Sequence, residues 1–448
     1  GFQKVSLRQS RFTRPARQQF PEHPLMTRIG YNKTMRAIIW ILAGFLFVCG
    51  WSQTADYTGY QVLRITVAHP KQFEQIQTLV RDVWSCSLKG RTIDVCASPE
   101  ERAALQKAGF TWQTLIEDVQ ALIESQRSDF QPQGDLFSRY LTLDEVYAAM
   151  RALAEQNPRL VQMLQVGVSV EGRPIYALRI TRDPRGARVY RDRPQVVFNA
   201  CQHAREWITV SVALYLAYAL VANYGVDARV TQWLQRTEVY VVPVVNPDGY
   251  VYTWTTNRLW RKNRRYLGTN NWGQPIYGVD LNRNWGFQWG GPGSSGQRSS
   301  ETYRGPAPFS EPETYTLSRW LLSLPTLRAH IDIHSYSQLI MWPWGYTDAL
   351  CYHHATFERI GLIMQQQIQS VHGMFYAAGP IYTTIYPASG NMCDWVYGVR
   401  GAFSFGYELR DTGQYGFLLP PDQILPNSEE FYPAALTLIE WMTTRRWD

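Results

Sequence analysis

The chain has 448 residues, of which 45% are hydrophobic and 14% aromatic, and its formal net charge is +7. This length and composition predict a globular protein of two or three domains with a large apolar core. Residues 1–34 hold seven Lys or Arg and one acidic residue, so the rest of the chain is nearly neutral, at +1. A nearly neutral globular part without a basic stripe excludes a module that binds nucleic acid or a membrane surface.

The N-terminal segment is expected to precede the folded protein. Residues 1–34 show no apolar periodicity, and we interpret them as a disordered leader upstream of a translation start at Met35. Residues 37–51 form an apolar run that is short for a membrane span and typical of a signal peptide, although a buried helix or a signal anchor are alternatives. We therefore predict a signal peptide at residues 35–55, and secretion.

Residues 56–127 have the pattern of a small α+β domain. Ser98 and Glu101 form a capping box with Pro99 at the first helical position, so a helix is predicted to begin there and to continue to residue 107. The other predicted elements are strands at 60–67 and 110–116 and helices at 70–83 and 117–127. Cys86 and Cys96 are candidates for a disulfide bond in this domain.

Longer elements follow from about residue 128. The predicted helices are 141–155, 207–224, 313–324 and 431–444, and the predicted strands include 194–200 and 239–245. Since these strands are continuously apolar, we expect a sheet covered by helices on both faces, which is an α/β architecture. The three cysteines of this region, Cys201, Cys351 and Cys393, are an odd number, so at least one should be a free thiol.

A metal-ligand spacing follows the first of these strands. His203 and Glu206 lie three residues apart, so that one imidazole and one carboxylate can face a single cation. His334 ends another strand-like run, 329–334, and ligands from neighbouring strand ends are how open α/β sheets build sites. A catalytic Zn²⁺ takes three such nitrogen and oxygen ligands and keeps a fourth position open.

Four further segments, 258–264, 278–285, 383–390 and 407–413, complete a pattern that resembles the zinc metallocarboxypeptidases of the A/B type in their secreted digestive zymogen form. The resemblance covers roughly residues 57–445. It implies an α/β fold with a mixed central sheet of about eight strands, one Zn²⁺ per chain and a monomer. It also implies that residues 56–127 are an activation propeptide and that residues 128–448 are the catalytic domain.

The resemblance also implies roles for individual residues. His203, Glu206 and His334 should bind Zn²⁺, and Asp280 should accept the second ring N–H of the first histidine. Glu408 should act as the general base, with a salt bridge to Arg410 as its structural alternative, and Arg261 should stabilise the oxyanion. The residues expected to bind the substrate are Arg205, Asn282, Arg283, Tyr336, Tyr386 and Cys393.

Cys393 occupies the position where family members specific for basic residues carry an aspartate. A neutral thiol cannot compensate a buried cation, so we expect release of aromatic or aliphatic C-terminal residues. The other matched pocket positions are apolar or small, namely Met341, Ile381, Ile385, Ala388, Gly345 and Gly406, and Asn391 and Met392 are expected to narrow the pocket. The alternatives are specificity for basic residues and an inactive binding protein on the same scaffold. The expected partners are the C-termini of peptides and proteins, a trypsin-like protease that cleaves after Arg127, and a protein inhibitor.

Overall fold

The computed structural model describes residues 54–69, 71–87, 90–128, 135–186 and 192–444, all of which belong to one compact unit. The predicted leader and nearly all of the predicted signal peptide lie outside these residues. Within the described part of the chain, no single helix is long and apolar enough to cross a membrane. The helices α6 (Trp207–Asn223) and α7 (Ala228–Arg236) reach the required length and composition only together, and the pair is bent by 105°.

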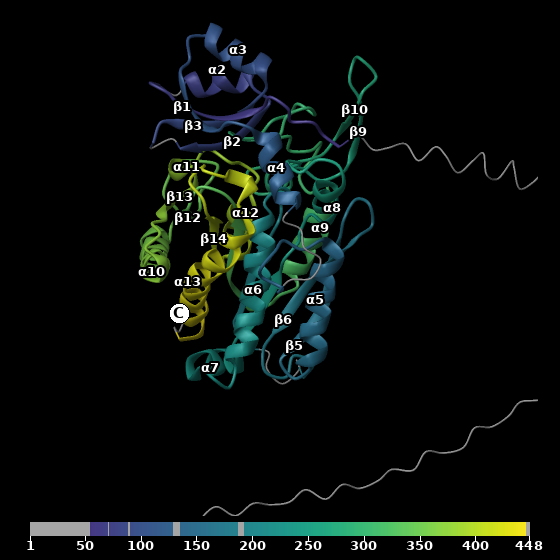
Figure 1. The fold of residues 1–448 in the computed structure, drawn as a ribbon. Helices are drawn as coiled ribbons and strands as arrows, with labels where there is room; N and C mark the ends of the chain where they lie inside the picture. The colour runs from purple at the N-terminus through teal and green to yellow at the C-terminus, as the bar shows by residue number, and fades with distance from the viewer. Residues whose placement is uncertain (1–53, 70, 88–89, 129–134, 187–191, 445–448) are drawn as a thin grey trace, which may run out of the picture. The chain divides into compact units, whose positions relative to one another are not determined.

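The described residues up to Ser128 form a small α+β subdomain, in which Figure 1 labels β1, β2, β3, α2, α3 and α4. Its four antiparallel strands are arranged in the order β2-β3-β1-β4. The strands are β1 (Gln61–Thr66), β2 (Asp82–Ser87), β3 (Thr92–Ala97) and β4 (Trp112–Ile116), and the helices are α2 (Lys71–Leu79), α3 (Pro99–Lys107) and α4 (Val119–Ser128). The predicted capping box is present, because Ser98 Oγ accepts from Glu101 N and Glu101 Oε2 accepts from Ser98 N.

Two predictions for this subdomain are wrong. The helix predicted over 70–83 ends at Leu79, and the residues from Asp82 onward pair with β3 instead. Cys96 is a free, buried cysteine whose cross-strand partner in β2 is Asp82, whereas Cys86 lies opposite Ile93. The proposed bridge between Cys86 and Cys96 therefore does not form.

The remainder of the chain is built on the predicted mixed sheet of eight strands, in the order β13-β12-β14-β11-β7-β8-β6-β5. The four central strands, β14, β11, β7 and β8, run parallel to one another, and β12, β6 and β5 join by antiparallel pairing. The strands are β5 (Val161–Val168), β6 (Pro174–Ile180), β7 (Gln195–Ala200), β8 (Glu238–Val242), β11 (Leu327–His334), β12 (Leu339–Trp342), β13 (Ala377–Pro380) and β14 (Phe403–Glu408), with a separate hairpin of β9 (Tyr266–Thr269) and β10 (Pro275–Tyr277).

Helices cover both faces of this sheet, as Figure 1 shows for α6 and α13 on one side. Alternate residues of β7 and β8 enter two separate cores: Phe198 of β7 and Val241 of β8 pack with α5, α6, α10 and α13, while Val197 and Tyr240 pack with α9 and α12. The helices are α5 (Leu143–Gln156), α6 (Trp207–Asn223), α7 (Ala228–Arg236), α8 (Pro247–Thr255), α9 (Pro312–Leu322), α10 (His354–His372), α11 (Ile381–Thr384), α12 (Met392–Arg400) and α13 (Ile424–Thr444).

Three neighbouring parallel strands end at one edge of the sheet. β7 ends at Ala200, and the chain turns at Cys201, whose φ is +58°, into the segment that carries His203 and Glu206. His334 and Glu408 are the last residues of β11 and β14 and are register partners. Because parallel strands finish side by side, residues separated by more than 200 positions meet at this edge.

Candidate active site

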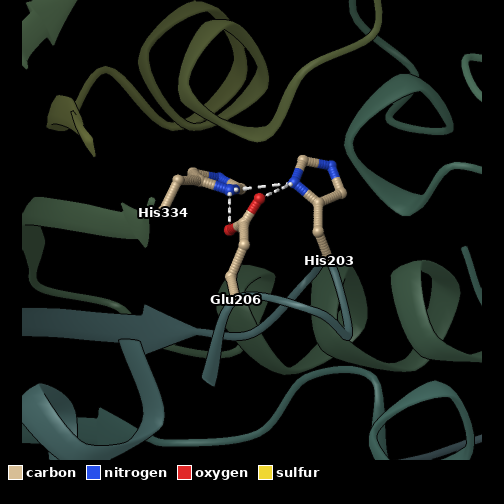
Figure 2. Close-up of side chains that lie close together, drawn as sticks. All are labelled: His203, Glu206 and His334. Atoms are coloured by element: carbon tan, nitrogen blue, oxygen red, sulfur yellow. Dashed lines mark hydrogen bonds and ion pairs between the residues drawn. The ribbon is translucent and has the colours of Figure 1, made fainter. Parts of the chain in front are cut away.

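Three buried side chains converge beyond the ends of β7 and β11, as Figure 2 shows. His203 Nδ1 lies 2.8 Å from Glu206 Oε1, and His334 Nδ1 lies 3.1 Å from Glu206 Oε2. The two Nδ1 atoms are only 3.2 Å apart. One potential ligand atom from each residue therefore lies within 4.8 Å of the others, which is a spacing suited to one metal ion.

The contacts of the Nε2 atoms of His203 and His334 indicate that the three side chains suit a cation. His203 Nε2 faces Asp280 Oδ1 at 3.1 Å, and His334 Nε2 faces Asp332 Oδ2 at 2.7 Å. When both Nε2–H groups donate to these carboxylates, both Nδ1 lone pairs face each other and Glu206. Burial lowers the pKa of His334, but Asp332 and Glu206 outweigh it and hold that pKa well above its ordinary value. The cluster therefore requires a proton or a cation among its three ligand atoms, and its donor set fits Zn²⁺.

Glu408 lies beside this cluster with one carboxylate oxygen unsatisfied. Its Oε2 is buried and has no hydrogen-bond partner within the described residues. Burial, and then the charge of Glu206, raise its pKa well above the ordinary value. The alternative pairing with Arg410 does not occur, because Arg410 forms its ion pair with Glu430. A carboxylate in this position can accept and return a proton.

Asp280 connects the metal cluster to Arg261. Its Oδ2 accepts from Arg261 Nη2 at 2.9 Å, while its Oδ1 faces His203 Nε2 and accepts from Asn282 N at 3.0 Å. Burial raises the pKa of Asp280, but Arg261, Arg283 and His203 together hold it well below its ordinary value. Asp280 is therefore a carboxylate that fixes both the His203 ring and the Arg261 guanidinium. Arg261 bonds to it through Nε and Nη2, and Arg261 Nη1 takes no part in this ion pair.

Asn282 and Arg283 follow in a short 3-10 turn, Leu281–Arg283. Asn282 Oδ1 accepts from Met392 N at 2.9 Å, and its Nδ2 lies 3.1 Å from His334 Nε2. The Arg283 guanidinium is buried, donates from Nε to Gly293 O at 2.8 Å and lies 5.6 Å from the centre of the Tyr386 ring. An amide, a guanidinium and a phenol are thus placed next to the metal cluster.

An apolar cluster lies between α11, α12 and strands β12 and β14. Cys393 is buried in it with four apolar side chains, namely Met341, Ile381, Ile385 and Ala388. A Cβ on Gly345 would lie 2.6 Å from Asn391 Nδ2, so only glycine fits there. Met392 was expected to narrow this pocket, but it packs into the core of the α9 and α12 side. Burial raises the pKa of the Cys393 thiol well above its ordinary value, so this side chain brings no charge to the apolar cluster.

The two remaining predicted residues, Arg205 and Tyr336, are covered by the N-terminal subdomain. Arg205 Nη1 pairs with both oxygens of Asp82, at 2.8 and 2.9 Å. Tyr336 Oη donates to Asp94 Oδ2 at 3.2 Å, and Asp94 is also paired with Arg64 at 2.7 Å. Sequence reasoning did not identify Asp82 and Asp94, since their importance depends on contacts across more than 120 residues.

Asp332 was also missed, although the sequence carried a signal for it. It lies two residues before His334 on the same strand, and residues i and i+2 of a strand share one face. An acidic residue at that spacing from a ligand histidine predicts a contact with the ring.

Comparison with known proteins identifies this constellation. Residues 146–434 match a family model described as zinc carboxypeptidase. Carboxypeptidase A2 of Mus musculus is 37% identical over 405 residues, which cover 86% of this chain and 94% of that protein. The structure of carboxypeptidase A from Helicoverpa armigera matches with a TM-score of 0.77 and 28% identity, over 87% of this chain and 98% of that one. Bovine thrombin-activatable fibrinolysis inhibitor, solved in complex with tick carboxypeptidase inhibitor, matches with a TM-score of 0.63 and 32% identity, over 69% of this chain and 99% of that one.

Proposed function

The chain belongs to the zinc carboxypeptidase family, and from this membership we propose that it is the secreted zymogen of an exopeptidase that releases aromatic or aliphatic C-terminal residues. The observation that carries the specificity is the uncharged pocket around Cys393. Secretion is supported by the apolar run at 37–51, which follows a basic residue as signal peptides do.

The substrate's terminal carboxylate is assigned to Arg283 and Asn282. A guanidinium and an amide N–H both donate to carboxylate oxygens, and an arginine can do so in a bidentate manner. Tyr386 lies against Arg283, so its hydroxyl can close over the same residue of the substrate. Binding of a free carboxylate at this point restricts cleavage to the last peptide bond.

Proton transfer is assigned to Glu408, and stabilisation of charge to Arg261. The bound zinc ion supplies a Lewis acid that makes water acidic enough to lose a proton near neutral pH. The unsatisfied Glu408 Oε2 takes the proton of the attacking water and delivers it to the leaving amine. Arg261, fixed through Asp280, donates from Nη1 to the carbonyl oxygen as negative charge develops on it.

The zymogen proposal rests on the contacts of the N-terminal subdomain. Asp82 and Asp94 occupy Arg205 and Tyr336, and Ser85 Oγ is hydrogen-bonded to Ser337 Oγ at 2.7 Å. These contacts would exclude a peptide from the approach to the metal. Arg127 is exposed in the last turn of α4, where a trypsin-like protease can reach it. The likeness to a relative solved with a tick inhibitor supports a protein inhibitor as a further partner.

The test is to treat the purified protein with trypsin and to assay blocked dipeptides that end in Phe, Leu, Lys and Asp. We expect hydrolysis of the Phe and Leu substrates after cleavage at Arg127, its loss on chelation, and its return with Zn²⁺. Full activity before cleavage would refute the zymogen proposal, and a preference for Lys would refute the specificity. Absence of hydrolysis from a cleaved, zinc-loaded protein would favour the inactive binding protein.

A further inference from the structure

A second buried carboxylate supports the metal cluster through His334, whereas Asp280 supports it through His203. Asp332 is fully buried, and its Oδ2 accepts from His334 Nε2 at 2.7 Å. Both residues project from the same face of β11, so the contact follows from the backbone and needs no loop to adjust. The strand therefore presents the ligand and its hydrogen-bond acceptor as one rigid pair.

Two amides fix the other lone pairs of Asp332. Asn199 Nδ2 donates to Oδ1 at 2.7 Å, and Gln202 Nε2 donates to Oδ2 at 2.6 Å. Gln202 immediately precedes His203, and its Oε1 accepts from Trp285 Nε1 at 3.0 Å. One carboxylate thus holds the ring of one ligand and the backbone segment that carries another.

The charge environment of Asp332 differs from that of Asp280. Asp280 is neutralised by Arg261, whereas Asp332 forms no ion pair with a Lys or Arg among the described residues. His334 is its ion-pair partner there and acts on it more strongly than His330 or His203. Amide donors stabilise a carboxylate without cancelling its charge. The negative charge of Asp332 therefore acts chiefly on His334 and, through that ring, on the cation site.

We propose that Asp332 is a positioning residue for the zinc site. It fixes His334 with Nδ1 toward the metal and strengthens that nitrogen as a ligand. Through Gln202, it also sets the distance between the end of β11, which carries His334, and the segment after β7, which carries His203. The proposal rests on the ligand set assigned above, and it concerns metal affinity and not substrate choice. Loss of a carboxylate that supports a ligand histidine typically weakens metal binding by about 10–100-fold.

The experiment measures the Zn²⁺ dissociation constant of the full chain by competition with a chelator, for wild type and for Asp332→Asn, Asp332→Ala, His334→Ala and Glu313→Gln. Asp332→Asn keeps the size of the side chain and one acceptor oxygen, removes the charge and the second acceptor oxygen, and is expected to fold. Glu313→Gln is the control for the loss of a buried carboxyl group, because Glu313 is equally buried, accepts from Val170 N and Asn263 Nδ2, and contacts no ligand residue.

We expect the dissociation constant to rise about 10-fold in Asp332→Asn and about 100-fold in Asp332→Ala, with no change in Glu313→Gln. The visible spectrum of the Co²⁺-loaded chain should shift in both Asp332 variants. Unchanged metal affinity in Asp332→Asn, with only a lower melting temperature of the metal-free chain, would show a merely structural role and overturn the proposal. Wild-type affinity in His334→Ala would instead refute the ligand set itself.

Discussion

Replacing Cys393 with Asp should convert the pocket from apolar to basic specificity. In the wild type, the cationic end of an Arg or Lys substrate would enter a buried cluster of apolar side chains and a neutral thiol. Asp394 adjoins this position but offers no free carboxylate oxygen for an ion pair, because it is fully buried and accepts from Gly345 N at 2.9 Å and Tyr346 N at 3.1 Å.

An uncompensated buried charge costs about 3–5 kcal/mol. Since about 1.4 kcal/mol is a factor of ten, the wild type should cleave an Arg substrate at least about 100-fold less efficiently than a Leu substrate, measured as kcat/KM. Cys393→Asp should raise kcat/KM for Arg by about 100-fold and lower it for Leu. Burial, and to a smaller extent the charges of Asp332 and Asp394, disfavour a negative charge at this position. The introduced carboxyl group should therefore have a raised pKa, and the gain should be larger at pH 8.5 than at pH 6.

The assay compares matched blocked dipeptides ending in Leu, Phe and Arg, with Cys393→Asn as the neutral control of similar size. Cys393→Asn should gain nothing on the Arg substrate. If the wild type cleaves the Arg substrate as well as the Leu substrate, or if Cys393→Asp leaves the ratio unchanged, the assignment of Cys393 to the base of the pocket is wrong.

Three further predictions test other parts of the site. Glu408→Gln should lower kcat by at least about 100-fold and leave zinc content unchanged, whereas Glu206→Ala should lose zinc; near-wild-type turnover in Glu408→Gln would remove it as the base. Asp82→Asn should raise the activity of the uncleaved chain and its rate of cleavage by trypsin, because it leaves buried Arg205 without its anion. Identical rates in both proteins would show that the Arg205–Asp82 ion pair does not hold the subdomain in place. Burial raises the pKa of Glu313 from 4.5 to about 8, so the free energy of unfolding should fall by at most about 5 kcal/mol as pH rises between those values. Urea unfolding at pH 5 and pH 8 measures this fall, and Glu313→Gln should abolish it. The same pH dependence in the variant and the wild type would contradict the prediction.

Much of the fold and the cation cluster was predictable because both depend on local patterns. A continuously apolar strand predicts a sheet covered on both faces, and parallel strand ends predict where distant ligands such as His203 and His334 meet. The ligand spacing and the strand ends each lie within a few residues of sequence, so no long-range information was needed to place them.

The rest depends on pairings between distant residues. The segment from Asp82 to Ser87 becomes a strand because β3 offers it a partner, and no glycine or proline after Leu79 marks the end of the preceding helix. The side of the sheet on which Met392 is buried is likewise decided by the packing of α12 and not by its neighbours in sequence. Tertiary context overrides local propensity at such positions.

The groups of the N-terminal subdomain that contact Arg205 are themselves held in place by further contacts. Trp84 Nε1 donates to Asp82 Oδ2 at 2.8 Å, and the Trp84 ring packs edge-on against Phe417, over which the Arg205 guanidinium lies at 4.0 Å. The subdomain therefore binds as a preorganised surface, which reduces the entropy lost on docking. While α4 connects the subdomain to the rest of the chain, its effective concentration is high, and the proposed cleavage after Arg127 would remove that advantage without breaking a noncovalent contact. If the chain is the zymogen proposed above, we therefore expect release of the subdomain, and not hydrolysis of the connecting bond, to be the step that exposes Arg205 and Tyr336 to a substrate.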